Sequence, residues 1–123
     1  MPARIRQFDA SAEYYFEEGC YINELSNTAD DPAVSIAQAR VKPGVVTRWH
    51  RLRDTVERYV ILSGTGRVEA GDLPPQEVRA GAVVVIPPLC RQRIANIGND
   101  DLVFLAICSP RFRPEVYEDL EEG

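Results

Sequence analysis

The chain has 123 residues, of which 45% are hydrophobic and 27% are charged. This length and composition predict one globular domain and exclude extensive disorder. The net charge of -5 at pH 7 lacks the positive excess of a general binder of nucleic acids or anionic membranes. The chain contains one histidine, which excludes a metal site built from several histidines.

The termini and the cysteines indicate a compartment. No long apolar stretch follows Arg4 and Arg6, so no secretory signal is expected, and the longest apolar run, Ala82–Cys90, is broken by two prolines. A membrane helix needs about 20 apolar residues. The three cysteines form no CxxC pair. We therefore expect reduced thiols in a cytoplasmic protein that contacts neither membrane nor nucleic acid.

The predicted elements are mostly short strands. Gly, Pro and Asn turns recur along the chain and separate runs of β-favouring residues. In chain order, we expect strands at Tyr21–Leu25, Ser35–Val41, Thr47–Arg51, Val56–Ser63, Gly66–Ala70, Ala82–Ile86, Arg91–Asn96 and Leu102–Cys108. Only the ends favour helix, within Ala10–Glu18 and in Pro114–Glu121. The pattern predicts an all-β sandwich or barrel.

The acidic residues concentrate at the C-terminus. Five acids lie in the last nine residues, namely Glu115, Glu118, Asp119, Glu121 and Glu122. Without them the rest of the chain is close to neutral. We interpret residues 114–123 as a solvated acidic tail.

The central segment carries the residues with chemistry. Between two turn glycines, Gly44 and Gly64, lie His50 and Glu57. If the two halves form neighbouring antiparallel strands, these side chains face each other on one surface. His50 can then act as a general acid or base while Glu57 orients its imidazole.

Strand alternation adds further candidates. It places Arg48 and Leu52 on the face of His50, and Tyr59 on the face of Glu57. Tyr59 can donate a proton, and Arg48 can hold an anionic group of a substrate. The alternatives are a packed strand residue for Tyr59 and a surface ion pair for Arg48.

This segment resembles the first motif of the cupin superfamily, G-x5-H-x-H-x3,4-E-x6-G. Gly44, His50, Glu57 and Gly64 match it at the correct spacing, while Leu52 stands where the second histidine belongs.

A second cupin motif, G-x5-P-x-G-x2-H-x3-N, lies further along the chain. Gly81, Pro87 and Asn96 match it, Leu89 replaces its glycine, and Gln92 occupies the position of its histidine. The resemblance implies a double-stranded β-helix, the jelly-roll barrel of the family, in one domain spanning residues 1–123. We expect the barrel core at about residues 20–110, short helical segments at the ends, and a homodimer.

The resemblance also implies a reduced metal site. Members of the family grip a divalent metal with histidines and a glutamate; here His50, Glu57 and Gln92 remain as donors. With waters they could hold Mn, Fe, Ni or Zn, although an amide oxygen is a poorer donor than imidazole, and an inward Arg48 would repel the cation. The alternative is no metal, with the three side chains forming a hydrogen-bonded cluster.

Three functions stay open at this point. The first is a small-molecule enzyme, oxygenase-like or isomerase-like, with a weak metal centre. The second is a metal-free isomerase, dehydratase or lyase that uses His50, Glu57 and Tyr59, with Arg48 and Gln92 binding the substrate. The third is a non-catalytic sensory module for a small molecule. Whether Glu24, Cys90, Cys108 or Arg111 reaches the pocket is left open by the sequence.

Overall fold

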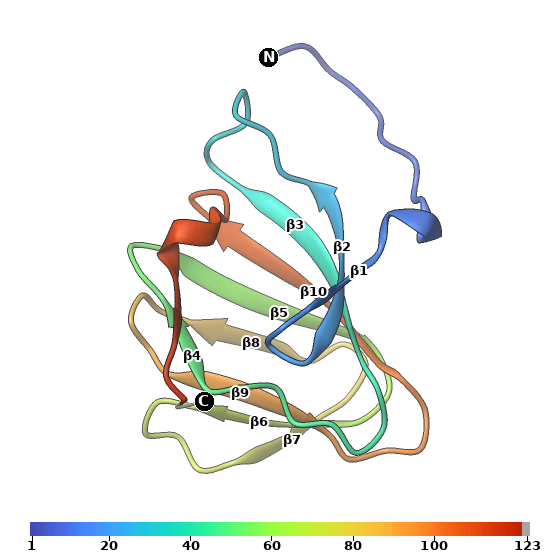
Figure 1. Cartoon of the computed structure of the whole chain (residues 1–123), viewed down its shortest axis with the longest axis vertical. Helices are drawn as coiled ribbons and strands as arrows, with labels where there is room; N and C mark the ends of the chain where they lie inside the picture. Colours follow the sequence, from blue (N-terminus) through green and yellow to red (C-terminus); the bar gives the residue numbers. More distant parts are fainter. Residues whose placement is uncertain (122–123) are drawn as a thin grey trace.

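The computed structural model describes residues 1–121, which fold into two antiparallel sheets packed face to face (Figure 1). The six-stranded sheet has the order β1 (Tyr14–Phe16), β2 (Cys20–Ser26), β3 (Ser35–Val41), β10 (Leu102–Ser109), β5 (Val56–Ser63) and β8 (Val83–Ile86). The five-stranded sheet has the order β11 (Tyr117–Asp119), β4 (His50–Leu52), β9 (Gln92–Asn96), β6 (Gly66–Ala70) and β7 (Gln76–Val78). Two 3-10 turns, η1 (Ala10–Ala12) and η2 (Pro114–Val116), complete the described elements.

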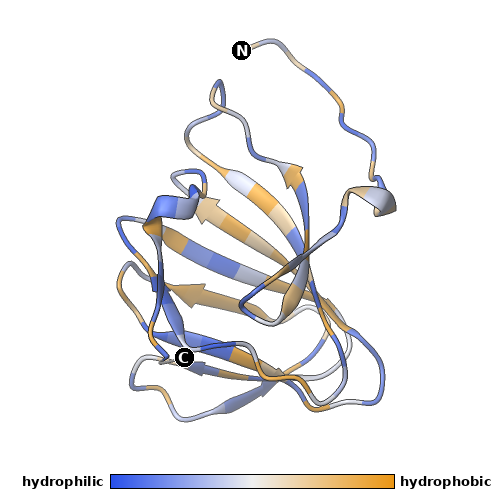
Figure 2. Cartoon of the chain, in the orientation of Figure 1, coloured by the Kyte–Doolittle hydropathy of each residue, from blue (hydrophilic) through white to orange (hydrophobic). Residues whose placement is uncertain are grey.

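The core lies between the two sheets because alternate residues of each strand point inward. On β5, Tyr59 and Ile61 are buried, and on β10 Phe104 is 2% exposed. Ile94 of β9 closes the core from the opposite sheet. Figure 2 shows β8 and β10 as hydrophobic along most of their length, whereas β4 and β7 are hydrophilic. None of the described helices is long and apolar enough to span a membrane.

The expected all-β fold is confirmed. Three predicted strands, Ser35–Val41, Val56–Ser63 and Gly66–Ala70, have the observed bounds of β3, β5 and β6. The others differ by one or two residues, except that β4 begins three residues later than expected, at His50. The three preceding residues instead run alongside β9, where Thr47 Oγ1 accepts a hydrogen bond from Ile94 N at 2.9 Å.

The helices expected at the two ends are only 3-10 turns. The remainder of each segment is strand: β1 pairs with β2, and β11 pairs with β4. Three-residue strands such as these have little local signal, and their hydrogen bonds to a neighbouring strand decide their conformation.

The acidic C-terminal segment is built into the barrel. Tyr117 pairs with Leu52, and Glu118 accepts a hydrogen bond from Arg51 Nε at 2.9 Å. The interpretation as a solvated tail is therefore wrong for β11, because Glu118 meets Arg51 of β4 and Asp119 meets Arg48, which precedes β4. Glu122 lies outside the described residues.

His50 and Glu57 do not lie on neighbouring strands of one sheet. The turn 53–55, in which Asp54 has a φ of 53°, carries the chain from β4 in one sheet to β5 in the other. The two side chains therefore approach each other across the space between the sheets. The expected proximity holds, but through sheet packing and not through strand pairing.

The turn glycine Gly64 is required by its surroundings as well as by its backbone. It has a φ of +87°, and a Cβ at this position would lie 2.7 Å from the carbonyl oxygen of Asp101. Gly44 has a similar φ of +80°, but nothing lies within 4 Å of its missing Cβ. Comparing substitutions at the two glycines therefore separates the free-energy cost of a left-handed backbone from that of a steric clash.

We expect Gly64→Ala to destabilise the protein by about 3 kcal/mol or more, because left-handed strain and overpacking add. Gly44→Ala, the control, should cost only about 1 kcal/mol from strain alone. Urea denaturation of both variants measures the two values. Equal losses would show that the close approach of Gly64 to Asp101 is absent.

Candidate active site

A pocket opens between the two sheets and is lined by side chains of β1–β5, β10 and β11 and of the segments beside them. Its free space, including the open mouth, is about 630 Å³. The side chains that line it are mostly apolar or aromatic, with a small set of titratable groups, namely Glu18, Glu24, His50, Glu57, Tyr59, Cys108, Tyr14 and Tyr117. A concave apolar pocket with few polar groups is the usual form of a small-molecule site.

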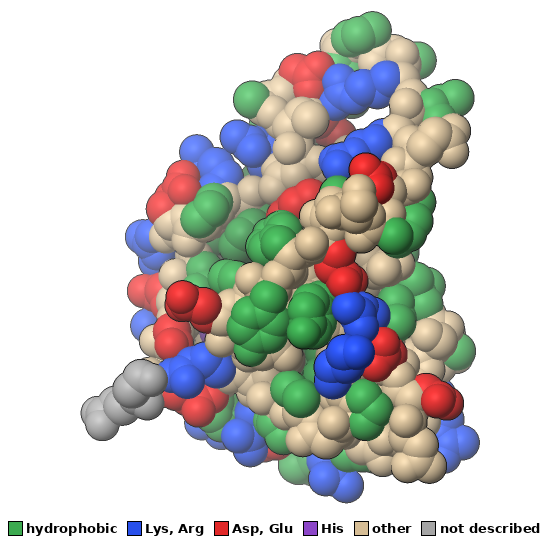
Figure 3. Space-filling model, turned by 45° about the vertical axis from the view of Figure 1, so that its right-hand side comes forward, with side chains coloured by type: hydrophobic (Ala, Val, Ile, Leu, Met, Phe, Trp, Pro, Cys, Tyr) green, Lys and Arg blue, Asp and Glu red, His purple; other side chains and the backbone are tan. Residues whose placement is uncertain are grey.

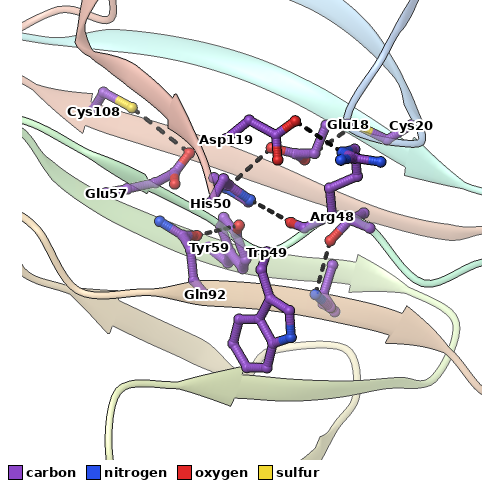
Figure 4. A network of polar contacts seen from close by, with 12 residues as sticks. Glu18, Cys20, Arg48, Trp49, His50, Glu57, Tyr59, Gln92, Cys108 and Asp119 are labelled. Atoms are coloured by element: carbon purple, nitrogen blue, oxygen red, sulfur yellow. Dashed lines mark hydrogen bonds and ion pairs between the residues drawn. The ribbon is translucent and has the colours of Figure 1, made fainter. Parts of the chain in front are cut away.

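His50 lies at the floor of this pocket and is 2% exposed. No purple atoms are visible on the face in Figure 3, in agreement with this burial. Its Nδ1 is 2.8 Å from the carbonyl oxygen of Arg48, and its Nε2 is 3.0 Å from Glu18 Oε1 (Figure 4).

These two contacts fix where the protons lie. A carbonyl oxygen only accepts, so His50 Nδ1 carries a hydrogen. The contact between His50 Nε2 and Glu18 Oε1 then holds a single proton, on one atom or the other. Burial lowers the pKa of His50, which favours the neutral imidazole with its Nε2 lone pair facing Glu18.

Glu18 comes from the turn between β1 and β2. Its carbonyl oxygen accepts a hydrogen bond from Arg48 N at 2.8 Å, which ties this turn to the residues that precede β4. Cys20 Sγ donates to Glu18 Oε2 at 3.4 Å. Burial raises the pKa of Glu18 from 4.5 to about 7, so this carboxyl group is a proton donor near neutral pH.

Glu57 is the second acid of the floor, and it reaches the pocket from β5. Cys108 Sγ lies 3.8 Å from its Oε2, and its buried Oε1 has no hydrogen-bond partner among the described residues. Burial, together with the neighbouring charge of Glu18, raises the pKa of Glu57 to about 7. Two acids whose pKa values lie near the working pH can exchange protons with a substrate.

Tyr59 and Gln92 form a pair behind Glu57. Tyr59 Oη donates to Gln92 Oε1 at 2.5 Å, and burial raises the pKa of Tyr59 well above its ordinary value. Gln92 Nε2 lies close enough to Glu57 to lower the pKa of that carboxyl group, yet it makes no well-formed hydrogen bond with it. Tyr59 is therefore a neutral donor that is already engaged.

Tyr117, from β11, covers the imidazole. Its ring stacks on His50 with centroids 5.2 Å apart and an interplanar angle of 18°. It also meets Phe16 edge to face, with centroids 5.1 Å apart. The two aromatic rings keep water from one side of the His50–Glu18 contact, which strengthens its electrostatics.

The structure brings together most of the predicted site residues but excludes Arg48. His50, Glu57 and Tyr59 line the pocket, and Gln92 is buried behind them, bonded to Tyr59. The Arg48 guanidinium lies outside, 3.0 Å from Asp119 Oδ2 (Figure 4). Because β4 begins only at His50, the strand alternation used to place Arg48 does not extend to it.

Sequence reasoning did not assign roles to two residues of the site. Glu18 lies in a turn, and Tyr117 lies in a segment read as a solvated tail; no spacing links either residue to His50. Of the residues left open, Glu24 and Cys108 line the pocket, whereas Cys90 and Arg111 are not among its lining residues.

The donors expected for a metal are arranged poorly for one. Both nitrogens of His50 are engaged, and Gln92 Oε1 accepts from Tyr59. Leu52, at the position of the missing histidine, offers no donor atom. Among residues 1–121, no three His, Cys, Asp or Glu side chains are grouped to hold a metal ion. As arranged, the residues do not fit a metal centre.

Two antiparallel sheets enclosing a pocket with titratable residues at its floor define a double-stranded β-helix, the jelly-roll class of small-molecule-binding barrels. The chain belongs to the cupin family, whose cupin domain matches residues 37–108.

Two relatives are similar in sequence. The uncharacterized protein MJ1618 of Methanocaldococcus jannaschii is 33% identical over 117 residues, covering 94% of this chain and 93% of that protein. A glucose-6-phosphate isomerase of Pyrococcus furiosus is 36% identical over 63 residues, covering 48% of this chain and 33% of the isomerase. The chain thus matches only a third of that enzyme.

Solved structures share the fold at low sequence identity. KdgF from Halomonas sp. superposes with a TM-score of 0.72 at 17% identity, covering 81% of this chain and 88% of KdgF. Pac13, described as a nucleoside dehydratase, superposes with a TM-score of 0.77 at 13% identity, covering 96% of this chain and 92% of Pac13. An oxalate decarboxylase from Lactobacillus farciminis superposes with a TM-score of 0.74 at 21% identity, covering 88% of this chain and 33% of the decarboxylase.

The raised pKa of Glu57 predicts a specific pH dependence of stability. Below about pH 7 the folded protein keeps this proton, whereas the unfolded chain releases it near pH 4.5, so stability falls as pH rises through this window. Glu57→Gln removes the ionisation, and the stability of wild type relative to this variant should fall by about 3 kcal/mol between about pH 4.5 and pH 8. Urea denaturation across this range measures it. A difference that is independent of pH would contradict the burial of an ionisable Glu57.

Proposed function

We propose that the protein is a metal-free acid–base enzyme of the isomerase, dehydratase or lyase type, acting on a small molecule bound between the sheets. The observation that carries this proposal is the 3.0 Å contact between His50 Nε2 and Glu18 Oε1, beside a second acid, Glu57. Acid–base chemistry needs one group that gives a proton and one that takes a proton at the same pH. Two buried acids with pKa values of about 7 provide both.

The proposed reaction follows from which of these groups can take a proton and which can give one. The ionised Glu57 takes a proton from a substrate carbon next to a carbonyl or hydroxyl-bearing carbon, and the electron pair of the C–H bond forms a C=C bond. In a dehydration, the C–O bond of the neighbouring carbon breaks, and the proton between Glu18 and His50 goes to the hydroxyl group, which departs as water. In an isomerisation, the π bond of the neighbouring carbonyl opens instead, and the same proton goes to its oxygen to give an enol. No oxidant or second reactant is needed, because one proton is taken and one is given.

The remaining residues orient and shield these groups. The Arg48 carbonyl oxygen holds His50 in the tautomer whose Nε2 faces Glu18. Cys20 and Cys108 each contact one of the two acids, and Tyr117 covers the imidazole. The apolar lining excludes water, so a proton is passed to the substrate and not to the solvent.

The comparisons support chemistry of this kind without identifying the substrate. A nucleoside dehydratase is among the structural neighbours, and a sugar-phosphate isomerase is among the sequence relatives. Both names describe reactions in which protons are rearranged on a hydroxylated molecule.

A weak metal centre at His50, Glu57 and Gln92 is the second candidate. His50 faces Gln92 across the β4–β9 pair, and the charge of Glu57 acts on His50. Binding a metal would require His50 to leave Glu18 and Gln92 to leave Tyr59.

The cytoplasmic location and the homodimer remain predictions.

The test uses protein stripped with a chelator and incubated in D2O with neutral sugars, nucleosides and α-hydroxy ketones. Proton NMR should show exchange of a C–H proton or loss of water. The rate should fall about 100-fold or more in Glu18→Gln and in His50→Asn, which keeps a donor for the Arg48 carbonyl but lacks Nε2. Glu17→Gln, an exposed glutamate next to Glu18, is the matched control.

Three outcomes separate the candidates. Turnover by stripped protein with the expected variant losses supports the proposal. Stoichiometric metal in protein purified without added metal, with turnover lost on chelation, replaces it with the metal centre. Saturable binding without turnover indicates a sensory module.

A further inference from the structure

We infer that the pocket takes a ligand without negative charge: an apolar, ring-sized molecule that carries an O–H or N–H donor. This inference rests on the proposed function only in taking the same pocket as the site. It names the chemical class of the substrate, which neither the family nor its relatives determine.

Among residues 1–121, the side chains that line the pocket and can carry a charge near neutral pH are acids, apart from His50. Three glutamates, Glu18, Glu24 and Glu57, are among the residues that line it. Within residues 1–121, no arginine or lysine lines the pocket. Whenever Glu24 or Glu57 is ionised, a carboxylate or phosphate on the ligand would therefore meet a like charge in a region of low dielectric, with no arginine or lysine of the lining to offset it.

Arginines close to lining residues are engaged with other groups. Arg6, whose charge acts on Glu24, donates to the carbonyl oxygen of Leu25 at 3.5 Å. The Arg48 guanidinium contacts Asp119 and the carbonyl oxygen of Glu121. Arg111, next to the lining residue Phe112, donates to Asn27 Oδ1 at 3.1 Å. The expected role of Arg48 as an anchor for an anionic group is thus not available from its observed position.

Within residues 1–121, one carboxylate oxygen of Glu57 lacks a hydrogen-bond donor. Its Oε1 is buried and has no hydrogen-bond partner among the described residues, although its Oε2 has Cys108. A buried carboxylate oxygen without a partner is costly, and a ligand hydroxyl or ammonium group would relieve that cost. A carboxylate or phosphate dianion on the ligand has no hydrogen to offer.

The side chains that form the walls of the pocket indicate the size and polarity of the rest of the ligand. Six phenylalanine and tyrosine rings line it, from Tyr14, Phe16, Tyr59, Phe104, Phe112 and Tyr117. Rings of this kind pack against a flat apolar body and also attract a cation to their faces. The walls are therefore suited to a ring-sized body with either kind of donor.

The experiment compares three probes of equal size, benzyl alcohol, benzylamine and benzoate, titrated at millimolar concentration into 15N-labelled protein. We expect benzyl alcohol and benzylamine to give saturable shifts at the amides of pocket-lining residues. Benzoate should bind at least about tenfold more weakly, because its charge matches that of the pocket. The tighter of the two binding probes shows whether the donor is a neutral hydroxyl or an ammonium group.

A charge-removing variant supplies the second arm. Glu24 lines the pocket but lies outside the His50–Glu18 contact and the Glu57 floor. Glu24→Gln should strengthen benzoate binding and weaken benzylamine binding, each about threefold, and leave benzyl alcohol unchanged. Glu17→Gln removes the same charge from an exposed position and should leave all three affinities unchanged.

Benzoate binding at the pocket amides as tightly as the other two probes would overturn the inference, and so would the absence of saturable shifts for all three. An equal response of benzoate to Glu24→Gln and Glu17→Gln would also contradict it. These measurements involve no turnover. Their failure therefore leaves the deuterium-exchange test of acid–base chemistry intact, and failure of that test leaves the charge preference intact.

Discussion

The burial of His50 against Glu18 is the constraint on which the site depends. The imidazole is fixed at Nδ1 by a backbone carbonyl oxygen, so its other nitrogen must share one proton with the carboxyl group. In water such a pair would exchange protons freely with solvent. Between the sheets, burial instead raises the pKa of the acid and lowers that of the imidazole, which keeps the proton within the pair.

The barrel fold brings the groups of this site together from distant parts of the chain. Glu18 comes from the first hairpin, His50 from one sheet, Glu57 from the other sheet, and Tyr117 from the C-terminal strand. His50, Glu57 and Tyr117 lie on paired strands, and the turn that carries Glu18 is bonded to Arg48 N. The same arrangement turns Arg48 and Arg51 outward, toward the acids of β11, and no arginine or lysine of the described residues lines the pocket.

The sequence predicted the local features of this protein well. The strands around Ser35–Val41 and Val56–Ser63 were found at their observed bounds because residue alternation and turn glycines are local signals. The proximity of His50, Glu57 and Gln92 followed from the resemblance to cupins. Glu18 and Tyr117 could not be assigned, since they reach His50 through three-residue strands whose pairing is decided by distant partners. The predicted position of Arg48 was wrong because β4, the strand whose alternation would have turned this side chain inward, begins two residues after Arg48, at His50.

The most direct test of this account is 15N NMR of the imidazole of His50, which gives a single set of ring signals because the chain has one histidine. At pH 7 the account predicts a neutral ring with its hydrogen on Nδ1 and a lone pair on Nε2, and protonation of Nε2 only at a pH below the ordinary histidine range. A ring with its hydrogen on Nε2 and a bare Nδ1, or a doubly protonated ring at pH 7, would contradict the account.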